Sequence, residues 1–182
     1  PNLLFELLVM GALSTAFIPV FTTFLVKNEE KAAWHMATHV INLCLVALGV
    51  LLVPLYIFAR PISYFLVPGF SETERELMVS YTRIMLVGQL VPLVIGNFAT
   101  GMLQSFQRFL LPALAPVLYN VGIILGILIL SPLVGLYGAV WGVVIGAVLY
   151  LLIQLPVLFK LGYRHQFVLN PRQPGVREVI KL

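Results

Sequence analysis

The sequence predicts an all-α membrane protein that crosses the bilayer several times. Hydrophobic residues make up 60% of the 182-residue chain and charged residues only 10%, and its mean hydropathy is +1.03. A soluble domain carries about 25% charged residues, so this chain cannot cover a surface that faces water. The charges are also clustered, and none lies in residues 7–26 or 109–159. Such uncharged stretches suit the hydrocarbon core of a bilayer.

A helix of about 20 residues crosses a hydrocarbon core about 30 Å thick. Charged loops and turn-forming residues divide the apolar part of the chain into five runs of that order. The five transmembrane helices are expected at about residues 6–26, 36–59, 82–103, 112–130 and 136–158. They form a single transmembrane bundle over residues 1–159.

The first two spans have clear boundaries. The first is interrupted by Pro19 and ends at the charged loop 27–31, and the second ends before Arg60. Proline removes a backbone hydrogen bond and bends a helix, so we expect a kink in the first span.

A longer loop, residues 60–76, is expected to join the second and third spans. It holds the tripeptide Pro68-Gly69-Phe70 and then an acidic run. Ser71 is predicted to cap the third helix, with Glu74 at the capping-box position, so that this helix begins near residue 72.

The last two spans share one uncharged stretch, residues 109–159, which is too long for one crossing. Ser131-Pro132-Leu133-Val134-Gly135 supplies the turn that divides it. Residues 160–182 are then expected to be a basic cytoplasmic loop that leads to a next helix.

Lysine and arginine in the loops predict the orientation, because they gather on the cytoplasmic side. One side receives Lys27, Lys31, Arg108, Lys160, Arg164, Arg172, Arg177 and Lys181. The other side receives only Arg60, Arg75 and Arg83. The N-terminal end is therefore expected outside and the C-terminal end in the cytoplasm. The chain begins with Pro1 rather than Met, so we expect an internal piece of a larger protein, with one helix missing upstream.

The sequence contains no catalytic constellation. It has no Asp, no Walker loop and no Gly-x-Ser-x-Gly motif, so we expect neither an enzyme nor a cofactor. His35 and His39 have the i, i+4 spacing of metal ligands but lack a third ligand nearby, so packing is the favoured interpretation and no metal is expected. Cys44 is interpreted as a packing residue. In a membrane protein the excess of basic residues indicates an anionic leaflet rather than nucleic acid.

Prolines and glycines recur at positions that affect helix packing. The prolines within or near the spans are Pro19, Pro54, Pro92, Pro116 and Pro156. Small residues form stripes at Gly88, Pro92, Gly96 and Thr100, at Gly122 and Gly126, and at Gly138, Gly142 and Gly146. Such stripes allow helix backbones to approach closely. Two interpretations remain open: static packing, or bent helices that slide during alternating access.

Polar side chains at membrane depth are the candidates for a binding cavity, since they must pair or line a wet space. They are Glu6, Ser14, His39, Asn42, Arg83, Gln89, Asn97, Asn120 and Gln154. Those chosen as substrate-binding candidates are Glu6, Ser14, Arg83, Asn97 and Asn120. For each one, hydrogen bonding between helices remains the alternative, and Glu6, Arg83 and Arg108 also suit a membrane interface.

Three stretches of the chain carry motifs that go beyond composition. The first is Pro1-Asn2-Leu3-Leu4 followed by residues 11–19. The second is Pro68-Gly69-Phe70. The third is Gln104-Ser105-Phe106-Gln107-Arg108-Phe109 with Pro112, Pro116 and Asn120. In these motifs, their order and their separations, essentially the whole chain resembles the MurJ/MviN family of lipid II flippases, within the multidrug/oligosaccharidyl-lipid/polysaccharide exporter superfamily.

The resemblance implies helices two to six of a fourteen-helix protein, most of the N-terminal lobe of two six-helix lobes around a central cavity. It implies a flippase that moves undecaprenyl-linked peptidoglycan precursor, lipid II, to the outer leaflet of the bacterial cytoplasmic membrane, without an ATP site. The implied partners are lipid II or a similar undecaprenyl-pyrophosphate-linked saccharide, membrane lipids and cell-wall synthesis proteins.

The chain departs from the family where a pair of arginines and an acidic residue are usual. Phe5, Glu6 and Met10 occupy those positions. Three alternatives therefore remain: an exporter of a related lipid-linked polysaccharide, a drug/cation exporter, and a non-transporting membrane scaffold for cell-wall assembly.

Overall fold

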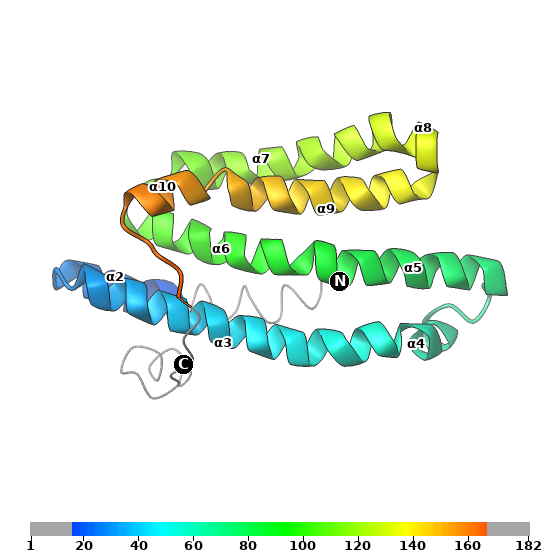
Figure 1. Ribbon diagram of the computed structural model, residues 1–182, viewed down its shortest axis with the longest axis horizontal. Helices are drawn as coiled ribbons and strands as arrows, with labels where there is room; N and C mark the ends of the chain where they lie inside the picture. Colours follow the sequence, from blue (N-terminus) through cyan, green and yellow to red (C-terminus); the bar gives the residue numbers. More distant parts are fainter. Residues whose placement is uncertain (1–15, 167–182) are drawn as a thin grey trace.

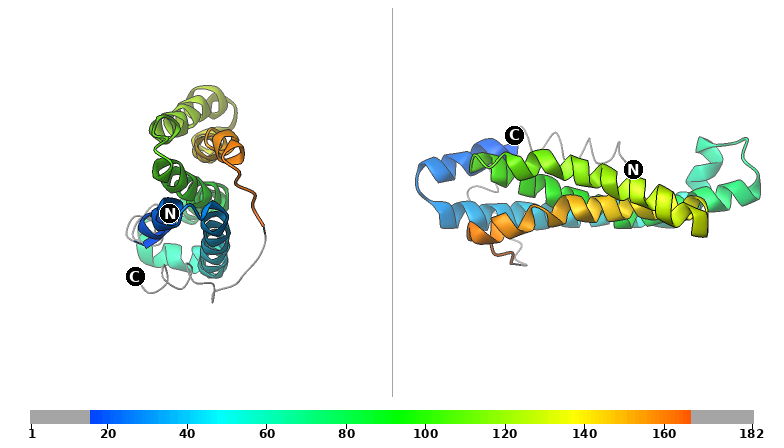
Figure 2. Two further views of the ribbon diagram at one scale, coloured as in Figure 1. Left: turned by 90° about the vertical axis from the view of Figure 1, so that its left-hand side faces the viewer. Right: turned by 90° about the horizontal axis from the view of Figure 1, so that it is seen from above.

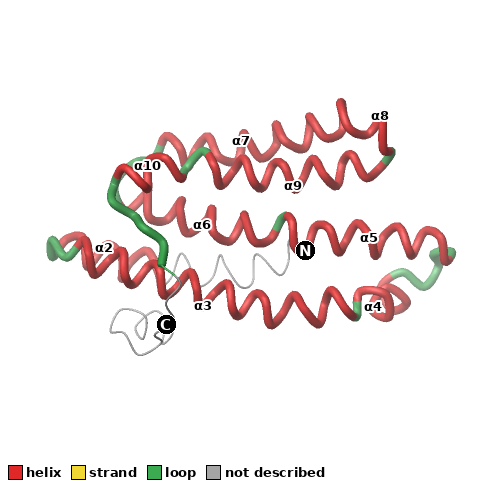
Figure 3. The backbone as a smooth tube through the Cα atoms, viewed as in Figure 1, coloured by secondary structure: helices red, strands yellow, loops and turns green. Residues whose placement is uncertain are grey.

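The computed structural model describes residues 16–166, and this part of the chain is helical without strands (Figures 1 and 3). Its longer helices are α3 (Glu30–Ile57), α5 (Glu72–Gly88), α6 (Leu90–Ser105), α7 (Leu110–Leu125) and α9 (Leu136–Leu152). Its shorter elements are α2 (Ile18–Val26), α4 (Ala59–Leu66), the π-helical turn η3 (Gly126–Leu130), α8 (Ser131–Val134) and α10 (Leu155–Lys160).

Four helical stretches are long and apolar enough to cross a membrane. They are Glu30–Ile57, Glu72–Ser105, Leu110–Val134 and Leu136–Lys160. The expected all-α polytopic membrane fold is thus confirmed. Residues 6–15 of the first expected span, together with Pro1–Leu4 of the motif, lie outside the described residues, and α2 covers the end of that span.

The spans pack as successive layers. In the end-on view, α7 lies outermost, α9 lies between α7 and the α5–α6 pair, and α3 with α2 forms the opposite side (Figure 2). We call the end that holds α4, α8 and the α5 N-terminus the α4/α8 end. The opposite end, which holds the α2–α3 and α6–α7 connections and α10, is the α2/α10 end.

The loop expected over residues 60–76 contains a helix, α4, which the sequence interpretation missed. Pro61 indicated a break, but proline is tolerated in the first turn of a helix, where backbone N–H groups lack partners. The next helix begins as predicted: the Ser71 side chain accepts from the backbone N–H of Glu74, and the Glu74 carboxylate accepts from the backbone N–H of Ser71.

Two spans are interrupted shortly before a proline. The break between α5 and α6 falls at Gln89, before Pro92, and the break between α9 and α10 falls at residues 153–154, before Pro156. Proline lacks the N–H that would continue the helical ladder, which accounts for breaks at these positions. Pro19 instead lies in the first turn of α2.

An aromatic cluster joins α2, α3 and α6 near the α2/α10 end. Phe17 packs edge-on against Phe98 with ring centroids 5.0 Å apart, and Trp34 stacks on Phe106 at 5.2 Å. Phe21 contacts both Phe17 and Trp34, at 5.5 and 5.4 Å. Buried aromatic rings supply large apolar contact areas, so this cluster fixes α2 against the spans.

The α7–α9 pair packs backbone against backbone through glycines. A Cβ atom on Gly122 would collide with the backbone of Gly146, and one on Gly126 with the backbone of Gly142. A Cβ on Gly138 would collide with the backbone around Ser131. The expected glycine ridge is therefore a close helix–helix contact.

Candidate functional site

A groove of about 470 Å³ opens beside α5 towards the α4/α8 end. Three helices, α3, α5 and α9, contribute its walls. It is lined by Tyr56, Ser80, Arg83, Ile84, Val87, Gly88 and Trp141. Of the proposed substrate-binding residues that the structure describes, only Arg83 lies in it, and it supplies the positive charge.

Arg83 is anchored on the C-terminal end of α3. Its Nε donates a hydrogen bond to the Tyr56 carbonyl oxygen at 3.0 Å, and its guanidinium carbon lies 5.0 Å from the centre of the Tyr56 ring. The carbonyls of a last helical turn lack partners and carry partial negative charge, so this contact is favourable. Among residues 16–166, no other group accepts from Arg83. Its two terminal amino groups therefore remain available to an anionic partner.

Aromatic side chains mark the depth of this groove. Tyr56 and Trp141 are each nearly half exposed on its rim, and Tyr81 and Tyr137 meet edge-on at 4.8 Å close by in the sequence. Tyrosine and tryptophan gather at the level of lipid headgroups. These aromatic residues therefore predict that the groove lies at the headgroup level.

Asn97 belongs to a buried network between α6 and the α9–α10 break. Its Oδ1 accepts from the Tyr150 hydroxyl at 3.3 Å, and that hydroxyl also lies 3.1 Å from Thr100 Oγ1. Thr100 Oγ1 donates to Gln154 Oε1 at 2.8 Å. The Gln154 amide donates to the Gly96 and Tyr150 carbonyl oxygens at 3.2 and 2.9 Å. Here the hydrogen bonds join helices.

The Gln154 side chain also replaces a backbone hydrogen bond that is missing at this break. Its own N–H donates to the Leu151 carbonyl three residues back, at 3.1 Å. The Tyr150 carbonyl thus loses its usual helical donor, and the Gln154 side chain supplies one instead. A fully buried side chain, with no exposed area, therefore holds the bend.

Asn120 lies on the outward side of α7. It is exposed, and its Nδ2 donates to the Pro116 carbonyl oxygen one turn back at 2.9 Å. Within the described chain, Arg83, Asn97 and Asn120 share no hydrogen bond, and they belong to separate surroundings. Glu6 and Ser14 lie outside the described residues, as do Phe5 and Met10.

The Pro68-Gly69-Phe70 tripeptide forms a tight turn, closed by a 3.2 Å hydrogen bond from the Phe70 N–H to the Val67 carbonyl. Gly69 has a negative φ and free space around its Cα. The backbone would therefore accept an L-residue there.

Arg75, which the sequence analysis did not select, fixes this turn. The side chain is 3% exposed, and its terminal nitrogens donate to the carbonyl oxygens of Ser63, Val67 and Phe70 at 3.0, 3.3 and 3.0 Å. Its guanidinium carbon lies 4.0 Å from the centre of the Tyr64 ring. The residue thus joins α4, the turn and α5. An arginine four residues after an N-cap serine, behind a turn, was the available signal.

Three helices, α2, α6 and α10, end at the α2/α10 end with the same type of C-terminal cap. Asn28, Gln107 and Gly162 have positive φ angles of 58°, 56° and 97°. Each sits just past its helix, and the next residue's N–H bonds to the carbonyl five residues back, the Schellman arrangement. Arg108 of the third motif makes one of these bonds, to the Leu103 carbonyl at 2.8 Å.

The two prolines of the third motif lie in α7. Pro112 is buried in its first turn, and Pro116 lies inside the helix. Four residues before Pro116, the carbonyl of Pro112 lacks the usual donor. The motif therefore shapes how α7 begins after the α6–α7 connection.

The two ends of the bundle differ in their charge pairing. Within residues 16–166, the ion pairs join Arg60 to Glu72 and Glu76, at 3.6 and 3.5 Å, and Arg75 to Glu72 at 3.7 Å. All lie at the α4/α8 end. The basic residues of the α2/α10 end have no ion pair within that part of the chain: Lys27, Lys31, Arg108, Lys160 and Arg164.

These features define a polytopic helical membrane protein whose spans are bent, closely packed and bordered by polar groups. The sequence model of the family described as lipid II flippase MurJ matches residues 1–182. The chain belongs to that family.

Individual relatives agree with the family assignment. The chain is 34% identical to the lipid II flippase MurJ of Burkholderia cenocepacia, which aligns with 99% of this chain and 36% of that protein. It is 31% identical to a probable lipid II flippase MurJ of Borreliella burgdorferi, with 90% of this chain and 32% of that protein covered. A probable lipid II flippase MurJ of Bdellovibrio bacteriovorus is 29% identical over the whole chain. The chain spans about a third of the length of these relatives.

Proposed function

We propose that this chain is part of a flippase that carries lipid II from the cytoplasmic to the outer leaflet of the bacterial cytoplasmic membrane, for peptidoglycan synthesis. The observation that carries the proposal is the family match along residues 1–182. Within the flippase the segment supplies five helices of the N-terminal lobe, and residues 160–182 lead to the next helix. Movement of an intact lipid needs no bond-breaking step, so no catalytic residue is invoked.

The α2/α10 end is proposed to face the cytoplasm. The basic residues there lack carboxylate partners within residues 16–166, whereas Arg60 and Arg75 at the other end are paired. Unpaired lysine and arginine near span ends favour the cytoplasmic side, where the leaflet is anionic. The N-terminal end of the chain is then outside, because its first span runs towards the α2–α3 connection.

Arg83 is proposed to contact the pyrophosphate of lipid II near the outer leaflet. Its terminal amino groups have no acceptor among the described residues, and guanidinium pairs well with phosphate oxygens. The groove beside it opens between three spans and has aromatic walls. In the proposed orientation this contact belongs to the outward-facing stage of transport.

The bends are proposed to allow alternating access. The α9–α10 break at residues 153–154 is bonded to α6 through Gly96 and Thr100, several residues beyond the α5–α6 break at Gln89. Bent helices that pack through small residues can rock as a unit. The breaks then serve as hinges inside one lobe, while the α7–α9 glycine contact keeps its geometry.

The test uses the full-length protein reconstituted in liposomes, with lipid II translocation as the readout. Arg83→Gln is expected to slow translocation about tenfold, the effect of losing one charge-assisted hydrogen bond. Arg60→Gln is the matched control, because this arginine lies at the same end but forms exposed ion pairs. Unaltered translocation by Arg83→Gln would remove this residue from the pathway. Transport of a cationic dye without lipid II would instead support a drug/cation exporter.

A further inference from the structure

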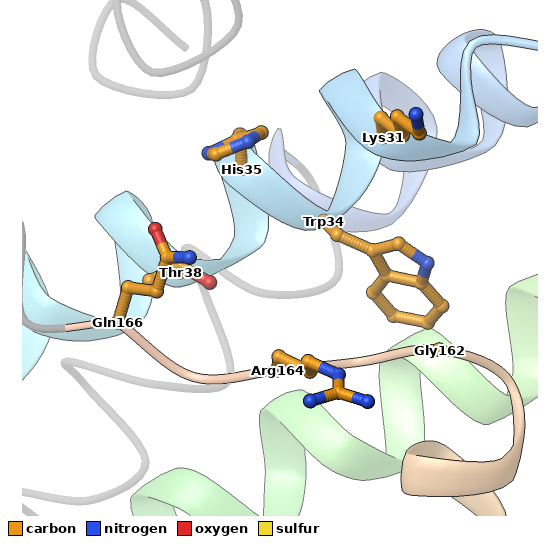
Figure 4. Close-up of a pocket in the computed structure, with 7 residues that line it drawn as sticks. All are labelled: Lys31, Trp34, His35, Thr38, Gly162, Arg164 and Gln166. Carbon is orange, nitrogen blue, oxygen red and sulfur yellow. The ribbon is translucent and has the colours of Figure 1, made fainter.

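A small basic pocket lies at the α2/α10 end, on the far side of the molecule from the Arg83 groove. Its volume is about 140 Å³, and it lies between the first turns of α3 and the segment that follows α10 (Figure 4). It is lined by Lys31, Trp34, His35, Thr38, Gly162, Arg164 and Gln166. The lining includes basic side chains from both walls and no carboxylate.

The segment after α10 is held firmly against α3. Gly162, with its positive φ, turns the chain back, and the ring of Tyr163 packs on Trp34 with centroids 5.6 Å apart. At the end of the segment, Asn42 Nδ2 donates to the Gln166 carbonyl oxygen at 2.8 Å. Two attachments therefore fix the wall that carries Arg164.

The hydroxyl of Tyr163 makes a further contact, within the segment itself. It lies 2.8 Å from His165 Nδ1. Burial raises the pKa of Tyr163 to about 12, although a hydrogen bond with Thr38 opposes that rise. The phenol therefore stays protonated at neutral pH and keeps its hydrogen bonds. Arg164 lies between these two residues and lines the pocket.

The charges in the pocket are uncompensated. Within residues 16–166, neither Lys31 nor Arg164 has a carboxylate within ion-pair distance. Lys31 lies on α3 and Arg164 on the facing segment, with Trp34 between them (Figure 4). An anion in the pocket would be attracted by the charge on both walls. Phosphate is the anion whose oxygens suit both a guanidinium and an ammonium group.

We infer that this pocket binds the phosphodiester group of an anionic membrane lipid. The pocket lies at the end of a spanning helix, and its floor is Trp34, a residue type that settles at the headgroup level. Basic pockets at the ends of transmembrane helices bind lipid headgroups in this way. The bound lipid would contact both α3 and the segment after α10. It would thereby hold α3 against the α9–α10 span.

The experiment measures lipid retained by the full-length protein in native mass spectrometry, with phosphatidylglycerol as the probe. The pocket variant is the double substitution Lys31→Gln with Arg164→Gln. The control is Lys27→Gln with Lys160→Gln, which removes the same charge from the same end without altering the pocket lining. We expect the pocket variant to retain about tenfold less phosphatidylglycerol than the wild type, and the control to change less than twofold.

Two further measurements distinguish a lipid phosphodiester from free phosphate as the ligand. Phosphatidylcholine should bind more weakly than phosphatidylglycerol, and millimolar inorganic phosphate should leave the bound lipid in place. Arg164→Lys, which keeps the charge, should retain most of the binding. Equal losses in the pocket and control variants would show diffuse attraction to charge and overturn the inference. Displacement of the lipid by inorganic phosphate would identify a free-anion site and also overturn it.

Discussion

At the residue scale, buried hydrogen-bonding side chains hold the places where the helices bend or stop. Arg75 fixes the turn at the α4/α8 end, and Gln154 fixes the α9–α10 break. Both act on backbone carbonyls that regular helix geometry leaves unpaired. The sequence singled out Gln154 as polar at membrane depth but gave no hint of its backbone partner. That partner depends on an irregular turn, which residue periodicity does not reveal.

Substitution of Arg75 by methionine tests the first of these roles. The change removes three hydrogen bonds to carbonyls and leaves the Phe70 carbonyl without its donor. We expect the free energy of unfolding of the full-length protein to fall by about 3 kcal/mol, measured by thermal unfolding in detergent. Arg60→Gln should change it little, because the ion pairs of Arg60 are exposed. Similar results for the two variants would contradict the role given to Arg75.

Gln107 offers a stabilising change. It is a non-glycine residue with a φ of 56° at the end of α6, where glycine adopts the same backbone without steric cost. Gln107→Gly is expected to raise the free energy of unfolding by about 1 kcal/mol. Gln104→Gly, inside the last turn of α6, should lower it by a similar amount. A stability loss in Gln107→Gly would show that the Gln107 side chain has a role of its own.

At the element scale, the glycine stripes explain how two apolar helices pair closely. Gly122 and Gly126 meet Gly146 and Gly142 across the α7–α9 interface. The stripe at Gly88 and Gly96 faces α9 as well, with their Cα positions against Val144 and Tyr150. Spacing alone predicted that these faces pack. It did not reveal which helix each face meets, because several helices present small residues.

The glycine contact predicts a sharp difference between two glycines. A Cβ on Gly142 would lie 2.8 Å from the Gly126 Cα, whereas a Cβ on Gly49 in α3 would meet nothing within 4 Å. Gly142→Leu is expected to lower the free energy of unfolding by about 1–3 kcal/mol or more, since rigid backbone must move. Gly49→Ala should leave it unchanged or raise it. Unchanged thermal stability of Gly142→Leu in detergent would refute the close contact.

At the scale of the whole molecule, the sequence predicted the class of fold, whereas the substrate-binding residues stay predictions. Hydropathy identified the spans because bilayer thickness dictates their length. The helix α4 was missed because a short amphipathic helix with a proline resembles a loop. Of the expected cavity residues, Arg83 lies in a groove, Asn97 joins α6 to α9, and Asn120 bonds to its own helix. Polarity at membrane depth indicates that a residue needs a partner, and only tertiary structure shows which partner it has.

The proposed function makes this chain one wall of a transport pathway. The chain covers about a third of its relatives' length, so the proposed activity belongs to the full-length protein. In that protein, the bent α5–α6 and α9–α10 spans are expected to move relative to a partner lobe, with Arg83 near the outer opening.

The most direct test is to express the full-length protein in a bacterium depleted of its own lipid II flippase. The readout is the fraction of lipid II that a membrane-impermeant reagent reaches in the outer leaflet. A flippase should restore both that fraction and growth, and Arg83→Gln should restore less of each at equal protein level. Lipid II that stays inaccessible, although the protein is abundant in the membrane, would contradict the proposed transport and favour a scaffold for cell-wall assembly.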